Sequence, residues 1–452
     1  MTTHQNAPDG VSGLTELMQD EYALQDIDIQ LEREVRRSRR RRGWLIVGIV
    51  FAVICAAIGG YVAWALTASV SAPSVTWHSP EVVAPGPVAI ALPVGGASAI
   101  SISGGDQYLG AEASGIWLSS GSDEPRSIAS ISKLITALVI LDAKPLASAE
   151  DPGPMITFDK DDHDLYDKYY VLGATIAAMP IGTTLSERDA LATMLIPSAS
   201  NYAQAMARWA FGSQGAFVNA TKDWLAAHGL TGTTIIEPTG ISYRNVSTPS
   251  DLLAIGKLAA AHPAIAQIVA TPALSLPGPG QIYNTNDLLG SNGITGLKTG
   301  NLGPGSYSLL YTASLDVGAP EPLQVTGVMV GGHSRESVNA SVLTLFDSIR
   351  SGFRRLPVAE LGQVVGSYST PWGSSAEVVI AEDADIFTWS DTPITTTMET
   401  TTPVSFTDGE EAGSITWTAG PNTATAIIEV EGTILPPTAW WRLTHPSELG
   451  GQ

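Results

Sequence analysis

Ser130 and Lys133 carry side chains that could together perform acyl transfer. They lie three residues apart at the start of an apolar run, so a helix would place both on one face, within reach of each other. A serine hydroxyl becomes an effective nucleophile when a neighbouring base takes its proton. Lys133 can act as that base only if its pKa falls well below about 10.4, through desolvation or a nearby positive charge. The spacing therefore predicts a nucleophile and its base, against the alternative of a chance match at a helix start.

Two later segments supply further polar groups. Ser198 follows Pro197 at a break between two helical runs. Its hydroxyl could relay a proton to a leaving group, or it could simply cap the helix expected over 199–211. Lys298-Thr299-Gly300 precedes a strand-like stretch; it offers a charge, a hydroxyl that can bond a carboxylate, and a glycine for close backbone approach. A plain turn is the alternative there, and the order of the three segments favours the chemical interpretation.

Composition and charge narrow the class of protein. The chain has 452 residues, 44% of them hydrophobic, and a net charge of −21. Almost all of that negative charge lies beyond residue 42, which argues against nucleic acid as a partner. The single cysteine, Cys55, excludes an intramolecular disulfide and a cysteine-rich metal site. We predict neither a metal nor a cofactor.

An uncharged stretch near the N-terminus predicts a transmembrane helix over 44–66. At about 1.5 Å per residue this stretch is long enough to cross a hydrocarbon layer of about 30 Å. Six arginines lie within 36–42, directly before it, and the near downstream flank has no lysine or arginine. The positive-inside rule then places residues 1–43 in the cytoplasm and the rest of the chain outside the cell membrane. A cleaved signal peptide is disfavoured, because the apolar run is too long and begins more than forty residues in.

The cytoplasmic tail and the region after the span have weaker signals. Residues 1–43 are expected to be mostly disordered, with a short surface helix or a partner-binding segment as alternatives. Residues 67–86 contain several prolines and few aliphatic runs, so they are expected to form a linker.

The remaining residues are predicted to form an α+β domain over 87–355 and a small β-rich module over 356–452. In the first, strand-like stretches come before and after a largely helical middle, and a last helix follows. The strand-like stretches of this domain lie at 88–92, 98–103, 116–118, 307–313 and 323–330, and its last helix is expected at 334–353. The module shows short strands separated by Gly, Pro, Asp and Thr turns.

The three polar segments resemble the S-x-x-K, S-x-N and K-T-G set of the penicillin-recognising serine acyl-transferases. Over roughly 96–355 the chain is similar to the D-alanyl-D-alanine carboxypeptidases, the low-molecular-mass penicillin-binding proteins. The similarity extends to Glu237-Pro238-Thr239-Gly240-Ile241 and to segments at 247–252 and 283–289. The resemblance implies a serine transpeptidase-like fold, which is an antiparallel sheet with a helical insertion.

The same resemblance implies a role for each catalytic residue. Ser130 corresponds to the acylated nucleophile and Lys133 to its base. Ser198 corresponds to the proton shuttle. The backbone N–H groups of Ser130 and Asn301 correspond to the oxyanion hole.

Substrate-binding residues follow from the resemblance as well, with one departure. Lys298 and Thr299 correspond to the pair that binds the terminal carboxylate of the substrate. The family's S-x-N places an asparagine where this chain has Ser200, and Asn201 comes one residue later. Either Ser200 makes a weaker polar contact or Asn201 reaches the substrate after a local shift. A basic residue of the family would fall near His333 or Arg335, and the sequence does not choose between them.

These observations predict a membrane-anchored serine D,D-carboxypeptidase. Its expected partners are the membrane, peptidoglycan stem peptides that end in D-Ala-D-Ala, and β-lactam antibiotics as inhibitors. One alternative is a β-lactamase-like hydrolase, although no Glu-x-x-Leu-Asn signature lies between Ser198 and Lys298. Another is a catalytically weak penicillin-binding protein that senses the wall, which the departure at Ser200 and the cytoplasmic tail both favour.

Overall fold

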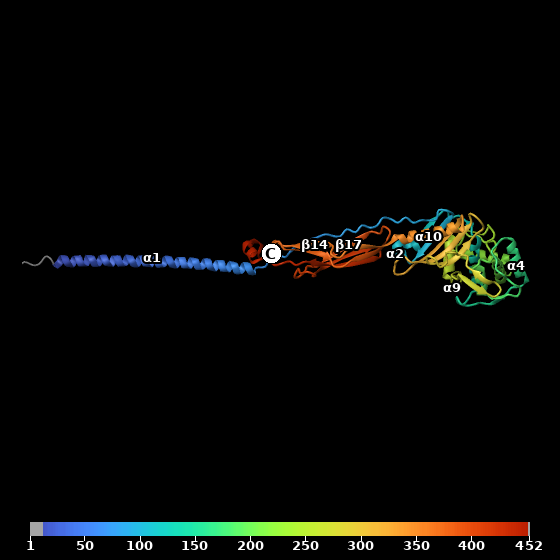
Figure 1. Ribbon diagram of the computed structural model, residues 1–452, viewed down its shortest axis with the longest axis horizontal. Helices are drawn as coiled ribbons and strands as arrows, with labels where there is room; N and C mark the ends of the chain where they lie inside the picture. Colours follow the sequence, from blue (N-terminus) through green and yellow to red (C-terminus); the bar gives the residue numbers. More distant parts are fainter. Residues whose placement is uncertain (1–11, 451–452) are drawn as a thin grey trace, which may run out of the picture.

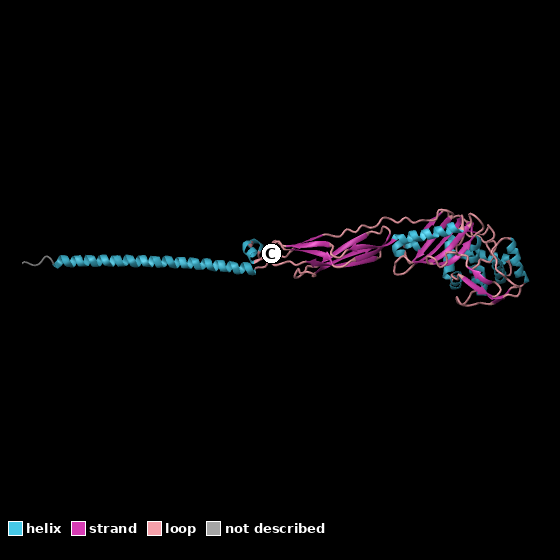
Figure 2. Cartoon of the chain, in the orientation of Figure 1, coloured by secondary structure: helices cyan, strands magenta, loops and turns pink. Residues whose placement is uncertain are grey.

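The computed structural model describes residues 12–450, which form an elongated molecule. A single long helix lies at one end, a β-rich region in the middle, and a region of mixed helix and sheet at the other end (Figure 1). Colouring by secondary structure shows the same three parts in series (Figure 2). The predicted α+β class, with one apolar N-terminal helix and a β-rich C-terminal region, is confirmed.

Helix α1 (Ser12–Thr67) is one element of 56 residues. It contains the predicted span 44–66 but begins much earlier, so the expectation of a mostly disordered tail is wrong from Ser12 onward. The reason is local: neither proline nor glycine occurs between Leu14 and Arg42. Residues 1–11 lie outside the described residues.

The C-terminal half of α1 has the surface of a membrane helix. Its large apolar side chains lie in the open, for example Trp44 and Phe51 with 75% and 67% of their surface exposed. Within residues 12–450, it is the one single helix long and apolar enough to cross a membrane without a partner helix. Exposed apolar surface on this scale is stable in lipid and unfavourable in water.

The β module is a six-stranded sheet in the order β1-β14-β15-β19-β18-β17. All of its strand pairs are antiparallel. Its strands are β1 (Ser74–Trp77), β14 (Val364–Ser369), β15 (Ser375–Ile380), β17 (Ile394–Thr400), β18 (Glu411–Ala419) and β19 (Asn422–Glu431). Alternate residues such as Val378, Trp417 and Ile428 face a common core and are fully buried. The module ends in two short helical segments that sequence patterns did not predict, α11 (Ala439–Thr444) and η3 (Pro446–Glu448).

Strand β1 corrects the prediction that residues 67–86 are a linker. Residues 74–77 pair with β14, from Ser74 opposite Ser369 to Trp77 opposite Gly366. Trp77 packs edge-on against Tyr368 with ring centroids 6.0 Å apart. The module is therefore built from two parts of the sequence, and the α+β region is inserted between them. We call residues 74–77 and 356–450 together the β module.

The α+β region is built on a five-stranded antiparallel sheet in the order β10-β11-β12-β2-β3. Its strands are β2 (Ala97–Ser103), β3 (Leu118–Ser120), β10 (Ile294–Gly300), β11 (Tyr307–Leu315) and β12 (Leu323–Gly332). One face, including Ile100 and Ile102, packs on helix α10 (Arg335–Gly352). The other face, including Ala99 and Leu310, packs on the helical middle of the chain. The sheet is thus covered on both sides, and β2 is buried along almost its whole length.

The helical middle of the chain covers the second face of the sheet. Its helices are η2 (Ala129–Ile131), α3 (Ser132–Ala143), α4 (Lys160–Val171), α5 (Glu187–Leu195), α6 (Ser200–Phe211), α7 (Gln214–Ala227), α8 (Pro249–Ala261) and α9 (Pro263–Val269). Three short two-stranded sheets accompany these helices. They are β4 (Arg126–Ser127) with β7 (Val246–Ser247), β5 (Met155–Thr157) with β6 (Thr184–Ser186), and β8 (Ala273–Leu276) with β9 (Gly280–Tyr283). The apolar helix α3 lies at the centre, with ten of its residues buried, Leu134 and Ile135 among them.

Two predicted strands of the α+β region need correction. Residues 88–92 form no strand, because their backbone N–H groups at Val88 and Ala91 are taken by the hydroxyls of Ser390 and Ser348. The strand expected at 116–118 lies two residues later, as β3. Two short helices, α2 (Asp106–Leu109) and η1 (Ala111–Ser114), come between β2 and β3.

An aromatic cluster joins the α+β region to the β module. Strands β13 (Phe353–Ala359) and β16 (Ala384–Trp389) form a two-stranded sheet at the junction. Phe353 packs against Trp389 and Phe387, with ring centroids 4.5 and 5.7 Å apart, and edge-on against Tyr108 at 5.6 Å. Aromatic packing of this kind stabilises the contact between the two regions.

Candidate active site

Ser130 and Lys133 meet at the turn where η2 enters α3. The Lys133 ammonium nitrogen donates to Ser130 Oγ at 3.0 Å and to the carbonyl oxygen of Thr239 at 2.6 Å. The Lys133 side chain is fully buried, and this burial lowers its pKa to about 7, while the nearby Glu237 carboxylate acts in the opposite direction. A substantial fraction of Lys133 is therefore neutral near neutral pH, which is the condition for taking a proton from Ser130.

A loop after α7 holds the other side of Lys133, and sequence reasoning assigned it no role. The Glu237 carboxylate accepts hydrogen bonds from the backbone N–H groups of Thr239 and Gly240, both at 2.7 Å, and from the Asn245 amide at 3.1 Å. These bonds fold residues 237–242 into a tight turn that aims the Thr239 carbonyl at Lys133. The Glu-Pro-Thr-Gly run was the only sequence signal of this turn.

Gly240 allows that turn to contact the Ser130 segment. It has a φ of +80°, and a Cβ at this position would lie 1.9 Å from the carbonyl oxygen of Ala129. Gly300 of β10 makes a similar approach from the other side, where a Cβ would lie 2.7 Å from the carbonyl oxygen of Ile128. Two glycines thus let backbone segments close around the residues that lead into Ser130.

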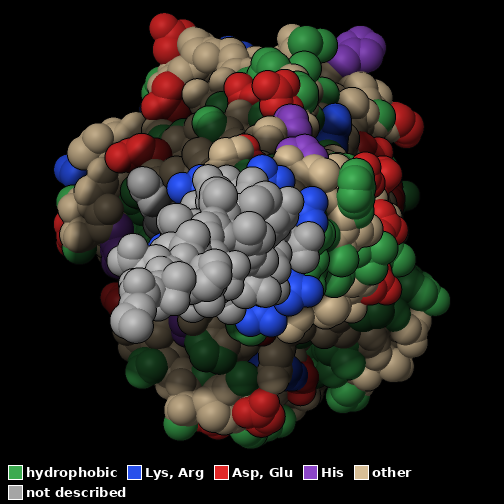
Figure 3. Space-filling view, turned by 90° about the vertical axis from the view of Figure 1, so that its left-hand side faces the viewer, with side chains coloured by type: hydrophobic (Ala, Val, Ile, Leu, Met, Phe, Trp, Pro, Cys, Tyr) green, Lys and Arg blue, Asp and Glu red, His purple; other side chains and the backbone are tan. Residues whose placement is uncertain are grey.

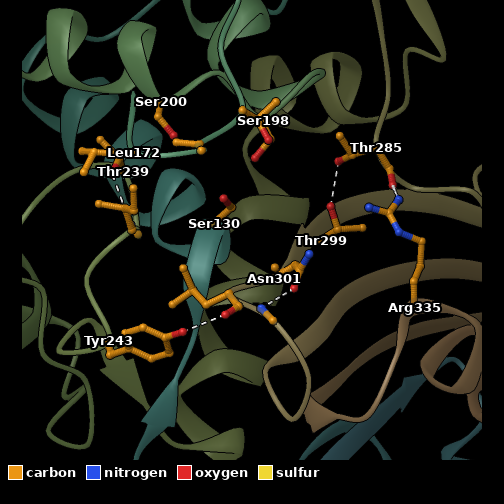
Figure 4. A pocket seen from close by; sticks show the side chains of 18 residues that line it. Ser130, Leu172, Ser198, Ser200, Thr239, Tyr243, Thr285, Thr299, Asn301 and Arg335 are labelled. Atoms are coloured by element: carbon orange, nitrogen blue, oxygen red, sulfur yellow. Dashed lines mark hydrogen bonds between the residues drawn. The ribbon is translucent and has the colours of Figure 1, made fainter. Parts of the chain in front are cut away.

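Ser198 faces the same space as Ser130 (Figure 4). Its backbone has a φ of +67°, which is unusual for a residue other than glycine. Its hydroxyl is buried and has no hydrogen-bond partner within the described chain. The N-cap position of α6 belongs to Ala199, and no side chain caps that helix. The alternative of Ser198 as a helix cap is therefore ruled out.

Lys298 lies beneath the cleft on β10. Its side chain is almost fully buried, and its nitrogen donates to the Thr285 hydroxyl at 3.4 Å and to the Thr299 carbonyl at 3.3 Å. Burial and the positive charges of Lys133 and Arg335 hold the pKa of Lys298 well below its usual value. A bound anion would relieve this unfavourable charge environment.

Thr299 and Arg335 complete this side of the cleft. The hydroxyls of Thr299 and Thr285 lie 2.7 Å apart, and Arg335 donates to the Thr285 carbonyl at 2.7 Å (Figure 4). Arg335 lines the cleft and His333 does not, so the structure chooses between the two candidates that the sequence left open. A single sequence could not make this choice, because either residue can start the last helix.

Ser200 and Asn201 are separated by the fold. Ser200 lines the cleft. Asn201 is fully buried elsewhere: its amide accepts from the N–H of Ala177 at 3.1 Å and donates to the carbonyl of the same residue at 2.8 Å. The hypothesis that Asn201 reaches the substrate is therefore not supported, and the residue fixes the loop before β6 instead.

The cleft has a volume of about 440 Å³. Its lining combines serine and threonine hydroxyls with Arg335, which is the one charged side chain among the described residues that line it. Tyr243 closes one end by donating from its hydroxyl to the carbonyl of Leu302 at 2.7 Å, next to Asn301 (Figure 4). Hydroxyl groups, an arginine and a buried lysine suit a ligand that carries a carboxylate.

Comparisons with known proteins agree with this geometry. The sequence model of peptidase S11, D-alanyl-D-alanine carboxypeptidase, matches residues 102–319. The chain is 29% identical over 197 residues to a D-alanyl-D-alanine endopeptidase of Pseudomonas aeruginosa, and 31% identical over 176 residues to one of Escherichia coli. These matches cover 42% and 37% of this chain and 60% and 52% of the two relatives, so the chain spans between about half and two thirds of their length.

Solved structures extend the likeness of fold beyond the matched segment. Penicillin-binding protein 6B of Escherichia coli superposes with a TM-score of 0.51 at 17% identity, over 79% of this chain and 100% of that one. Penicillin-binding protein 5 of Haemophilus influenzae gives a TM-score of 0.50 at 16% identity, over 77% and 98%. Such identities show a shared fold alone. In sequence, residues 102–319, which include Ser130, Lys133, Ser198 and Thr299, are similar to the D-alanyl-D-alanine carboxypeptidase family.

Proposed function

We propose that the chain is a membrane-anchored serine D,D-carboxypeptidase that removes the terminal D-alanine from peptidoglycan stem peptides. The observation that carries this proposal is the buried Lys133 with its nitrogen 3.0 Å from the hydroxyl of Ser130. The match of residues 102–319 to the D-alanyl-D-alanine carboxypeptidase model supports the class of reaction. β-Lactam antibiotics are the expected inhibitors, because their reactive carbonyl would acylate the same serine.

In the proposed acylation step, neutral Lys133 takes the proton of Ser130 while the serine oxygen attacks the carbonyl carbon of the penultimate D-alanine. The backbone N–H groups of Ser130 and Asn301 stabilise the oxyanion that forms. Ser198 passes the proton to the amine of the terminal D-alanine as its C–N bond breaks. Water then attacks the ester on Ser130, its proton is taken up by Lys133, and the serine is restored.

Recognition of the substrate's free carboxylate follows from the charges around the cleft. The Thr299 hydroxyl would donate to the carboxylate, with Arg335 beside it and Lys298 beneath it. A bound carboxylate would also favour the protonated form of Lys298, which burial and two neighbouring cations oppose. The binding energy of the terminal residue is therefore coupled to the charge state of a buried lysine.

A second candidate is a D,D-endopeptidase that cleaves peptide cross-links. The observation in its favour is that the curated relatives at 29% and 31% identity carry the name endopeptidase. A β-lactamase-like hydrolase is less well supported. It needs a carboxylate that activates water in the cleft, and the Glu237 carboxylate instead lies outside the cleft lining, bonded to backbone and amide N–H donors.

We also propose the topology and the division of the chain. Residues 1–43 would be cytoplasmic, 44–66 would cross the membrane, and the catalytic domain (87–355) and β module would lie outside. The arginines of 36–42 and the exposed apolar surface of α1 support this orientation. Protease added to intact protoplasts should remove the catalytic domain and spare the N-terminal tail. Complete protection of the domain would contradict the orientation.

The activity can be tested with the full chain in detergent and two substrates. We expect release of D-alanine from a stem pentapeptide, covalent labelling of Ser130 by fluorescent penicillin, and loss of both in Ser130→Ala, which should melt at the same temperature. Cleavage of a cross-linked dimer without D-alanine release would favour the endopeptidase. Penicillin labelling without turnover of either substrate would favour a sensory protein, and rapid hydrolysis of penicillin would favour the β-lactamase.

A further inference from the structure

The C-terminal segment of the chain returns to the end of helix α1. The Tyr61 hydroxyl of α1 donates to the carbonyl of Leu443 at 2.7 Å. Arg442 of α11 donates to the carbonyl oxygens of Ala68 and Ala65, at 2.7 and 3.4 Å. Ala65 belongs to the last turn of α1 and Ala68 directly follows it, at the end of a helix where carbonyls have no internal donors and where the dipole favours a positive charge. Helix α11 is therefore docked on the point where α1 ends.

Backbone contacts close this arrangement. The N–H of Gly450 donates to the carbonyl of Ser69 at 2.9 Å, and Val70 forms a bridge with Leu449. The described C-terminal residues therefore lie beside the end of α1 (Figure 1).

Aromatic side chains from three elements gather at this place. Trp372, in the turn between β14 and β15, packs edge-on against Trp441 of α11 with ring centroids 5.7 Å apart. Trp440 of α11 has 75% of its surface exposed. Tyr61 and Trp64 stand 6.0 Å apart on α1. We call these five residues the aromatic collar.

The register of α1 sets the depth of the aromatic collar. From Trp44, the first residue of the uncharged span, Tyr61 lies about 26 Å along the helix at about 1.5 Å per residue. A hydrocarbon layer is about 30 Å thick, so Tyr61 and Trp64 fall at its outer boundary. Because α11 is hydrogen-bonded to Tyr61, it lies at the same level. Tryptophan and tyrosine are the side chains that favour this boundary, where one end of the ring is apolar and the other is hydrated.

Charge agrees with this placement. Residues 439–444 contain no acidic side chain, and Arg442, the one charged residue of α11, donates to the carbonyl of Ala65 in α1 and to that of Ala68 just after it. Acidic side chains are scattered over the face of the molecule that is seen from the N-terminal end of α1 (Figure 3). An anionic lipid surface would repel most of the ectodomain but not α11.

We propose that the aromatic collar is a lipid-binding surface, and that α11 lies in the headgroup region of the outer leaflet. The proposal rests on α1 crossing the membrane as described under Proposed function. With lipid on one side and α1 on the other, α11 fixes the angle at which the β module leaves the membrane. The chain then binds the bilayer at two places, through the transmembrane span and through the aromatic collar.

The single native cysteine makes a direct test possible. Cys55 of α1 reports on the span, and a Cys55→Ser background allows one new cysteine at a time at Trp440 or at Thr423, an exposed residue at the opposite end of the module. Each full-length variant is labelled with an environment-sensitive fluorophore and placed in nanodiscs of zwitterionic and anionic lipid. Spin-labelled lipids with the quencher near the headgroup or at the chain end then give the depth. Penicillin labelling checks that each variant is folded.

We expect the label at 55 to be quenched by the chain-end quencher, the label at 440 by the headgroup quencher, and the label at 423 by neither. If 55 is quenched while 440 behaves like 423, the span stands and the lipid-binding collar is overturned. If 55 is not quenched, the membrane anchor itself fails, and the collar with it. A label at 440 that is shielded only at high protein-to-lipid ratio would mean that a second copy of the chain covers the collar, which also overturns the proposal.

Discussion

The α+β region and the β module treat charge in opposite ways. The first buries Lys133 and Lys298 close to each other, and lowers the pKa of both. The second, over its described residues, buries no charged side chain and fills its core with residues such as Trp417, Val378 and Ile428. Burying a cation costs free energy, and a purely structural unit gains nothing in return for that cost. The difference indicates which region is built for chemistry and which for support.

Removal of the buried base should have the largest effect. Lys133→Met keeps the volume of the side chain but removes the proton acceptor, so penicillin acylation of Ser130 should fall by about 10²–10⁴-fold. Stopped-flow or gel-based labelling measures the rate. An unchanged rate would mean that another group serves as the base.

The pH dependence of the same pair gives a second signature. Because the pKa of folded Lys133 is about 7, its neutral fraction, and with it the acylation rate, should rise as pH increases through about 7 and then level off. The unfolded chain binds more protons between pH 7 and about 10.4, so folding stability should rise with pH in that window, by at most about 1.4 kcal/mol per pH unit for this one group. In Lys133→Met, denaturant unfolding at several pH values should show a smaller slope. An equal slope in both proteins would contradict the lowered pKa.

A matched pair of glycine substitutions compares the two regions directly. Gly240→Ala places a Cβ 1.9 Å from the Ala129 carbonyl, whereas Gly362→Ala in the β module meets open space; both residues have positive φ. Each should lose about 1–3 kcal/mol of stability to backbone strain. Only Gly240→Ala should displace the Ser130 turn, which we expect to slow acylation about a hundredfold. Equal acylation rates in the two variants would show that the turn does not depend on this contact.

The smallest expected effect concerns Ser200. Because this hydroxyl lines the cleft where the family has an amide, Ser200→Asn should restore one hydrogen bond to the substrate peptide. Such a bond is typically worth about 0.5–1.5 kcal/mol, so acylation should become a few-fold to about tenfold faster. Asn201→Ala should instead lower the melting temperature, since it breaks two bonds to Ala177, with little change in the rate of the folded protein. A large loss of rate in Asn201→Ala with normal stability would reverse this assignment.

The parts of the site that depend on local spacing could be predicted from the sequence. Ser130 and Lys133 meet because helical geometry brings residues three apart together. The role of Ser198 could not be decided in this way, because the sign of its φ and the missing cap bond arise from tertiary packing. Whether Arg335 or His333 lines the cleft depends on where strand β12 ends and helix α10 begins. The Glu237 turn was not foreseen, because its donors are mostly backbone N–H groups that leave no trace in residue types.

Prediction of the fold from the sequence has the same limit, because strand pairing also depends on tertiary contacts. Alternating apolar residues predicted β2, and apolar strand-like stretches predicted β11 and β12. The pattern at 88–92 was equally regular, but side-chain hydroxyls take two of its backbone N–H groups and no strand pairs with it. Strand β1 was missed because its four residues are too few to show a strand pattern; its partner Ser369 lies 295 residues after Ser74.

That distance has a consequence for how the protein is made. Because β1 pairs with β14, the β module is interrupted in the sequence by the whole α+β region. During synthesis β1 emerges first and must wait, unpaired, until most of the chain has followed. The α+β region, whose sheet needs only residues 97–332, can complete its fold during that interval. If the β module closes last, the α+β region that separates β1 from β14 is already folded. The pairing of β1 with β14 then costs less loop entropy than it would across an unfolded segment of the same length. A folding defect in the α+β region should therefore leave β1 without a partner, and an unpaired strand edge is prone to aggregation.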